Sequence, residues 1–126
     1  MTGPFLDLII VVDCAEPAVL AGWWQGLLGG EVSTDSDGDA QLRAPGQPRL
    51  DFLRVPEGKT VKNRLQLDLD TIDLDAAVTV AFAHGAVPAP DVCPPSAAFV
   101  VLRDPAGNEF CLLAPETAGG VSEQPG

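Results

Sequence analysis

Hydrophobic and polar residues recur along the chain with two different periods, which predict strands and helices. The run Phe5–Asp13 is apolar and rich in β-branched residues, as in a buried strand. Over Ala15–Leu28, apolar residues recur at helical spacing, and Gly29-Gly30 ends this predicted helix. Three further strands are predicted, separated by turns rich in Gly, Pro and Asp, at about 31–34, 40–43 and 49–55.

The same order of elements returns after about 60 residues, which indicates an internal repeat. Residues 64–70 alternate strictly, with Leu65, Leu67 and Leu69 on one side and polar residues on the other. A helix is predicted over 73–84, followed by strands at about 86–89, 98–103 and 108–113. Each copy therefore reads strand, helix and three strands, or βαβββ.

This repeat predicts one domain over residues 1–115, made of module one (about 5–58) and module two (about 63–115). The remaining residues, 116–126, are rich in Gly, Pro and Glu, and we expect a flexible tail. One βαβββ copy leaves an apolar sheet face that it cannot cover alone. We therefore expect a curved sheet with helices outside and a cavity inside, and the cavity is the expected place of function.

Charge and composition narrow the possible partners. The chain has 7 basic and 18 acidic residues and a net charge of −11, which disfavours nucleic acid and anionic membranes as partners. No apolar run reaches the roughly 20 residues of a membrane span, and no secretory signal is visible, so we expect a cytoplasmic protein. Three cysteines without a CxxC pair are expected to be reduced, and the single histidine, His84, excludes a His-rich metal site.

Three segments of the chain resemble the vicinal oxygen chelate superfamily, which includes glyoxalases and bleomycin-resistance proteins. They are Val12–Gly30, with its Trp23-Trp24 pair, Lys62–Asp70, and Arg103–Cys111, which contains Asp-Pro-Ala-Gly-Asn. The resemblance implies an α+β fold in which two βαβββ modules form a half-open, eight-stranded mixed barrel. It also implies a homodimer and a small organic molecule as the partner.

Metal-using members of this superfamily place four ligands on the first and last strands of their modules. The corresponding positions here are Leu6, Gln66, Cys111 and Phe52, or Asp51 if the register slips by one residue. Leu and Phe offer no donor atom and Gln offers only a neutral oxygen, although Glu109 could substitute for Cys111. We therefore expect no metal and no cofactor.

The expected cavity combines an apolar lining with a polar strand face. Asp68 and Glu109 are candidates for a general base, and the alternative for Glu109 is an ion pair with Arg64 or Arg103. The basic stretch 59–64 is interpreted as a linker that could neutralise cavity acids. The full set of candidate cavity residues is Leu6, Leu8, Phe52, Arg64, Gln66, Asp68, Phe99, Glu109 and Cys111.

Three functions fit this sequence, and the third is that of an interaction module without a ligand. The first is metal-independent binding of a small molecule, as in superfamily members that sequester antibiotics such as bleomycin or mitomycin. The second is a metal-free enzyme of secondary metabolism, an isomerase, cyclase or hydrolase, with Asp68 or Glu109 as its base. Composition alone does not separate them.

Overall fold

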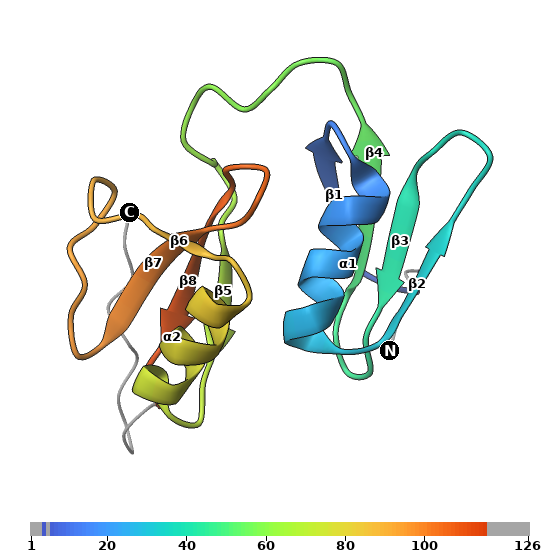
Figure 1. Cartoon of the computed structure of the whole chain (residues 1–126). Coiled ribbons are helices and arrows are strands. Elements are labelled where there is room, and N and C mark those ends of the chain that lie inside the picture. The colour runs from blue at the N-terminus through green and yellow to red at the C-terminus, as the bar shows by residue number, and fades with distance from the viewer. Residues whose placement is uncertain (1–3, 5, 116–126) are drawn as a thin grey trace. The chain divides into compact units, whose positions relative to one another are not determined.

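The computed structural model describes residue 4 and residues 6–115, and the chain divides into two compact units, Met1–Gly58 (unit 1) and Lys59–Gly126 (unit 2). Unit 1 contains, in chain order, β1 (Ile9–Cys14), α1 (Pro17–Leu28), β2 (Glu31–Thr34), β3 (Ala40–Arg43) and β4 (Arg49–Arg54) (Figure 1). Unit 2 contains β5 (Leu67–Asp70), α2 (Leu74–Ala83), β6 (Val87–Pro88), β7 (Phe99–Arg103) and β8 (Glu109–Leu113). The α+β class and both βαβββ modules are confirmed.

Two of the expectations fall partly or wholly outside this description. The first strand was predicted from Phe5, which is not described, and β1 begins at Ile9. The predicted tail, 116–126, also lies outside the described residues. Within the part of the chain that is described, no helix is long and apolar enough to cross a membrane.

The last strand of each unit occupies an inner position in its sheet. The strand orders are β1-β4-β3-β2 and β5-β8-β7-β6. The first and last strands pair in parallel, Ile9 with Arg49 in unit 1 and Leu67 with Phe110 in unit 2, and the other pairs are antiparallel. Because two parallel strands cannot be joined by a hairpin, each unit needs a crossover connection between its first and last strands. The helix lies within this connection.

The alternation of side chains in unit 1 separates a buried face from an open one. Phe52 lies between Val12 and Ala40 in neighbouring strands, and Leu50 lies beside Leu42. These β3 and β4 side chains are buried, on the face against which α1 packs. The residues one position along, including Asp51 and Leu53, therefore lie on the opposite face.

Unit 2 covers its sheet on both faces. Phe110 and Leu112 alternate with Glu109, Cys111 and Leu113, and all five residues of β8 are buried. Leu113, Cys111 and Val101 form a cluster with Ala89, against which Val92, Cys93 and Phe99 pack. The loop between β6 and β7 thus covers part of the face that carries Cys111.

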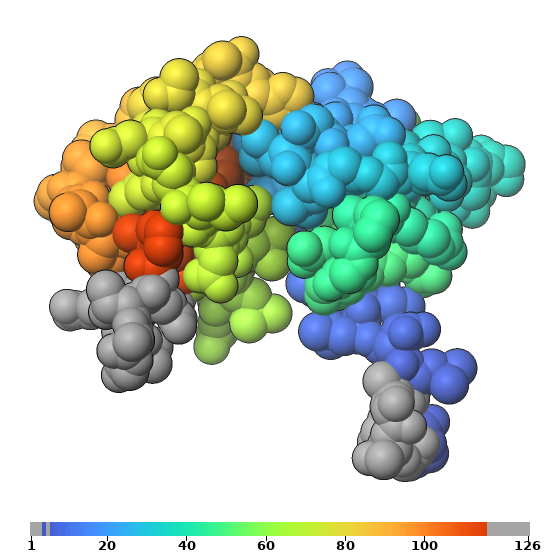
Figure 2. Space-filling view, turned by 90° about the horizontal axis from the view of Figure 1, so that it is seen from below, coloured from blue at the N-terminus to red at the C-terminus, as the bar shows by residue number. Residues whose placement is uncertain are grey.

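The ends of the elements follow from local chemistry. Asp73 caps α2, because its Oδ1 accepts a hydrogen bond from the Ala76 amide at 3.1 Å. Gly30 has a φ of 92°, and a Cβ there would lie 2.3 Å from the Arg43 carbonyl oxygen, so only glycine fits. Both helices expose their outer sides, at Val19 in α1 and Val80 in α2, and the space-filling view shows helix atoms at the surface (Figure 2).

The register of β4 is testable through stability. Phe52→Ala should lower the free energy of unfolding by about 3–5 kcal/mol, because it removes a ring that is 0% exposed beneath α1. Leu53→Ala, one residue along and 37% exposed, should cost only about 1 kcal/mol. Urea unfolding followed by tryptophan fluorescence measures both, since Trp23 and Trp24 lie in α1. Equal losses in the two variants would contradict the register.

Candidate functional site

The apolar residues predicted for the cavity lie in different parts of unit 1. Leu6 and Leu8 are 82% and 68% exposed and line a pocket of about 550 Å³ together with Arg43 and Arg49. Phe52 instead lies in the core beneath α1. The sequence left open whether Phe52 or Asp51 occupies the metal-ligand position on the last strand of module one. The structure places Asp51 on the open face of the sheet.

Asp51 is already engaged on that face. Its carboxylate accepts two hydrogen bonds from Arg49, from Nε at 2.8 Å and from Nη2 at 3.1 Å. A bidentate pair of this kind uses both oxygens of the carboxylate and holds the arginine in one orientation. Asp51 and Arg49 therefore form a closed polar pair within unit 1.

In unit 2, the strand register brings several predicted polar residues to one face. Asp68 lies beside Cys111, which in turn lies beside Val101, and Glu109 lies beside Arg103. The Gln66 side-chain amide, just before β5, donates a hydrogen bond to Asp68 Oδ1 at 3.3 Å. A row of polar groups thus follows this face of the sheet. Of the other two candidates, Arg64 is exposed and Phe99 packs on the cluster around Cys111.

Cys111 is a core residue and not an activated thiol. Its side chain is completely buried among apolar groups. Burial, followed by the nearby Asp68 and Cys93, raises the pKa of the Cys111 thiol to about 12. At neutral pH the thiol stays protonated, so it is neither a nucleophile nor a thiolate ligand.

Glu109 is a buried carboxylate with a lysine as its counter-ion. Its side chain is 3% exposed, and Oε2 lies 2.8 Å from Lys59 Nζ. Burial by itself raises the pKa of Glu109, but the Lys59 ammonium and the backbone amide of the residue itself together bring this pKa below its ordinary value of 4.5. The expected partners were Arg64 or Arg103, and the structure corrects this to Lys59.

The reason for this correction lies in the segment that precedes β5. Lys59 also donates a hydrogen bond to the Val61 carbonyl oxygen, and the Asn63 side-chain amide donates one to the Glu109 carbonyl oxygen at 3.0 Å. These two contacts hold the linker against the start of β8. Arg103 is engaged elsewhere, by two hydrogen bonds to Asp91 at 3.0 and 2.7 Å.

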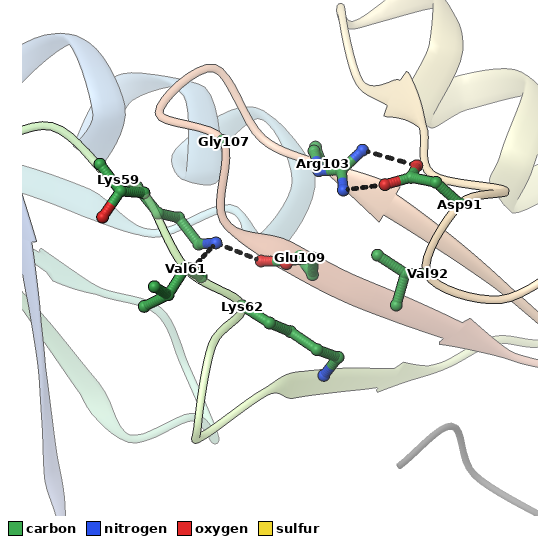
Figure 3. Close-up of a pocket in the computed structure, with 9 residues that line it drawn as sticks. Lys59, Val61, Lys62, Asp91, Val92, Arg103, Gly107 and Glu109 are labelled. Atoms are coloured by element: carbon green, nitrogen blue, oxygen red, sulfur yellow. Dashed lines mark hydrogen bonds and ion pairs between the residues drawn. The ribbon is translucent and has the colours of Figure 1, made fainter.

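A pocket of about 570 Å³ opens beside Glu109, and Figure 3 shows the side chains that surround it. Charged groups dominate its wall, together with two valines. The lining residues are Lys59, Thr60, Val61, Lys62, Asp91, Val92, Arg103, Gly107 and Glu109. All of them belong to unit 2, and this pocket is the candidate functional site.

Of these lining residues, only Glu109 was among the predicted cavity residues. Lys59 and Lys62 were visible in the sequence as part of a basic linker, and they are the only two lysines of the chain. Asp91 and Val92 carried no such signal, because they lie in an irregular loop without a period. Their contribution depends on how the loop folds back over the sheet.

One buried acceptor atom on this side of unit 2, Gln66 Oε1, has no hydrogen-bond donor among the described residues. Buried acceptors normally have a donor, supplied by protein, water or a ligand. The buried Glu109 Oε2 atom lies 2.8 Å from Lys59 Nζ, so the lysine ammonium satisfies it.

The residues at the usual metal positions do not fit a divalent cation. Leu6 offers no donor, Asp51 is held by Arg49, and the Cys111 thiol is protonated and buried. Across residue 4 and residues 6–115, no three His, Cys, Asp or Glu side chains are grouped as metal ligands would be. Gln66 alone leaves a neutral amide oxygen, which binds such ions weakly.

Comparisons with known proteins identify the family. Residues 9–113 match the model of the glyoxalase-like domain, and the chain therefore belongs to this family. Among curated proteins, none matches the sequence significantly.

Solved structures with the same fold belong to proteins with diverse described functions. A glyoxalase/bleomycin resistance protein/dioxygenase from Nocardioides is 15% identical, with a TM-score of 0.71 over 100% of this chain and 93% of its own. TnmS3, an antibiotic binding protein from Streptomyces sp. CB03234, is 17% identical, with a TM-score of 0.62 over 92% of this chain and 100% of its own.

A metal-containing structure is also similar. It is a mutant of FosX, the fosfomycin resistance protein of Listeria monocytogenes, in complex with Mn(II) and 1S,2S-dihydroxypropylphosphonic acid. The identity is 12% and the TM-score 0.70, over 91% of this chain and 93% of that chain. At these identities the likeness shows the fold alone.

Titration of Glu109 tests the Lys59 ion pair. In the wild type, the carboxyl should titrate below 4.5, and in Lys59→Met its pKa should rise above that value, because burial remains while the counter-ion is lost. Lys62→Met, which removes a lysine that does not pair with Glu109, should leave the pKa nearly unchanged. Carbon-detected NMR of the Glu109 carboxyl measures all three, and equal shifts in both variants would refute the assignment.

The same shift has a consequence for stability. Because the pKa of Glu109 is lower in the folded state than in the unfolded state, the carboxylate stabilises the fold above the unfolded pKa. This contribution is lost as the pH falls through the folded-state pKa. Glu109→Gln should therefore flatten the loss of stability on acidification below about pH 5, as measured by urea unfolding at a series of pH values.

Alkylation tests the burial of Cys111. Iodoacetamide at pH 8 should modify Cys93, which is half-buried, much faster than Cys111, whose thiol is buried and has a pKa of about 12. Peptide mass spectrometry before and after addition of urea measures the two sites separately. Rapid labelling of Cys111 in the folded protein would contradict its placement in the core.

Proposed function

We propose that this protein binds a small organic molecule without a metal ion, and that the molecule occupies the pocket beside Glu109. The observation that carries the proposal is a buried, ionised carboxylate at the wall of a pocket of about 570 Å³. This volume is in the range of ligand pockets, which combine apolar walls with a few fixed polar groups. Val61 and Val92 supply apolar wall here, and Glu109, Lys59 and Arg103 supply the polar groups.

The chemistry of the site favours binding over catalysis. An efficient general base has a pKa near the working pH, whereas the Lys59 ion pair keeps the pKa of Glu109 below the ordinary glutamate value despite its burial. The Cys111 thiol, which lies beside Asp68 on this face, is protonated and buried. Neither group is prepared to transfer a proton or attack a substrate at neutral pH.

Sequestration of an antibiotic or metabolite is the biological role that we propose for this binding. It is supported by the family membership and by the fold shared with TnmS3, an antibiotic binding protein. The net charge of −11 disfavours nucleic acid as a partner, and we propose a cytoplasmic location. We also expect a homodimer, the commonest assembly of such proteins.

Binding and turnover of the same molecule separate the two possible functions. Bleomycin and mitomycin, supplied with EDTA, should bind saturably in a calorimetric titration, and Glu109→Gln should weaken binding by a few-fold to about 100-fold. Glu31→Gln, which removes an exposed carboxylate of unit 1, should have no effect. Liquid chromatography of the incubated mixtures should recover each compound unchanged.

Two results would overturn this function. One is multiple turnover of a compound that is abolished by Glu109→Gln or Asp68→Asn, which would establish a metal-free enzyme. The other is binding that requires Mn(II) and disappears with EDTA.

A further inference from the structure

Three of the seven basic residues of this acidic protein line the pocket of unit 2. The chain has only 7 basic residues against 18 acidic ones, yet both of its lysines and Arg103 line this pocket. The pocket wall carries only two acids, Asp91 and Glu109. Its formal charge is therefore +1, from three cations and two anions, in a protein whose net charge is −11.

Only two of the three cations of the pocket form ion pairs. Lys59 is paired with Glu109, and Arg103 with Asp91. Lys62 lines the pocket but forms no ion pair with any residue that the structure describes, and Figure 3 shows its side chain extending away from Glu109 and Arg103. Lys62 is thus the cation whose charge is uncompensated.

Arg103 is fixed in place and still has donors to offer. Its two hydrogen bonds to Asp91 use one N–H on each terminal nitrogen. A guanidinium has five N–H groups, so three remain for another acceptor. The Asp91 pair holds the guanidinium at the pocket, and a preorganised arginine binds a planar oxyanion well.

Glu109 places a negative charge at the pocket wall, where its Oε2 atom is buried and lies 2.8 Å from Lys59 Nζ. A carboxylate can accept more than one hydrogen bond, so a hydroxyl or N–H group of a ligand can also donate to Glu109. A carboxylate or phosphate at the same point would instead be repelled by Glu109.

We propose that the pocket binds a small organic acid that also carries a hydrogen-bond donor. Arg103 binds its carboxylate or phosphate, the uncompensated charge of Lys62 adds to the attraction, the Glu109 carboxylate accepts a hydrogen bond from its hydroxyl or N–H group, and Val61 and Val92 contact its apolar part. This inference rests on the proposed small-molecule function and specifies the class of ligand. It differs from the cationic or neutral ligand that net charge alone would favour, because the local charge at the pocket has the opposite sign.

Three matched probes separate the two parts of the proposal. Meta-hydroxybenzoate carries an acid and a donor, benzoate carries the acid alone, and meta-hydroxybenzamide carries the donor without the charge. Calorimetric titration of the full chain should rank them in the order hydroxybenzoate, benzoate, hydroxybenzamide. We expect a loss of about 5- to 10-fold for the missing hydroxyl and at least as large a loss for the missing charge.

Two matched variants test whether the charge of Lys62 contributes to the affinity for the acid. Lys62→Gln should weaken hydroxybenzoate binding about 5- to 10-fold and leave hydroxybenzamide binding unchanged. Arg64→Gln removes the same charge two residues away, at an exposed residue outside the pocket lining, and should change neither affinity. Both positions are exposed, so unchanged melting temperatures should accompany both substitutions.

Several outcomes would overturn the inference. They are equal affinity for the acid and the amide, equal loss in Lys62→Gln and Arg64→Gln, or no saturable binding of either acid up to about 10 mM. Binding of bleomycin or mitomycin without saturable binding of either acid would leave the proposed function standing and reject only the ligand class. Failure of every probe would count against both.

Discussion

Parallel pairing between the first and the last strand is the constraint on which each unit depends. In unit 1 it joins β1 to β4, and in unit 2 it joins β5 to β8. Since parallel neighbours need a crossover, a helix must lie between them in sequence, and it then packs on one face of the sheet. The last strand is hydrogen-bonded on both sides, which makes it the most buried strand in unit 2.

The two units share this plan but differ in the face that the helix leaves open. In unit 1, that face exposes Ile9, Val11 and Leu53. In unit 2, Val92 and Cys93 pack over Val101 and Cys111, so the centre of the face is closed by apolar groups. The charged side chains of the pocket therefore lie at the end of the sheet where β8 begins, and Glu109 is the first residue of this strand. The position of the pocket follows from this closure.

Electrostatics then determine what that end of the sheet can do. Burial alone would favour a neutral glutamic acid at position 109, but Lys59 keeps it ionised. A carboxylate held in this way is a firm hydrogen-bond acceptor and a weak base. The same segment brings Lys62 to the pocket, while Asp91 fixes Arg103. Two ion pairs and one uncompensated lysine thus give the pocket a charge opposite in sign to that of the protein.

The sequence by itself determined the elements of this protein, because each depends on a local period. Alternation with a period of two predicted a strand over 64–70, of which the structure forms Leu67–Asp70. Helical spacing predicted both helices, and Asp73 and Gly29 marked a beginning and an end. It also placed Glu109 and Asp68 on one sheet face. Only the tertiary structure decided which face of β4 carries Phe52, since a slip of one residue reverses every side chain. It alone also decided that Lys59 binds Glu109 and Asp91 binds Arg103, because these partners come from irregular segments whose path no period specifies.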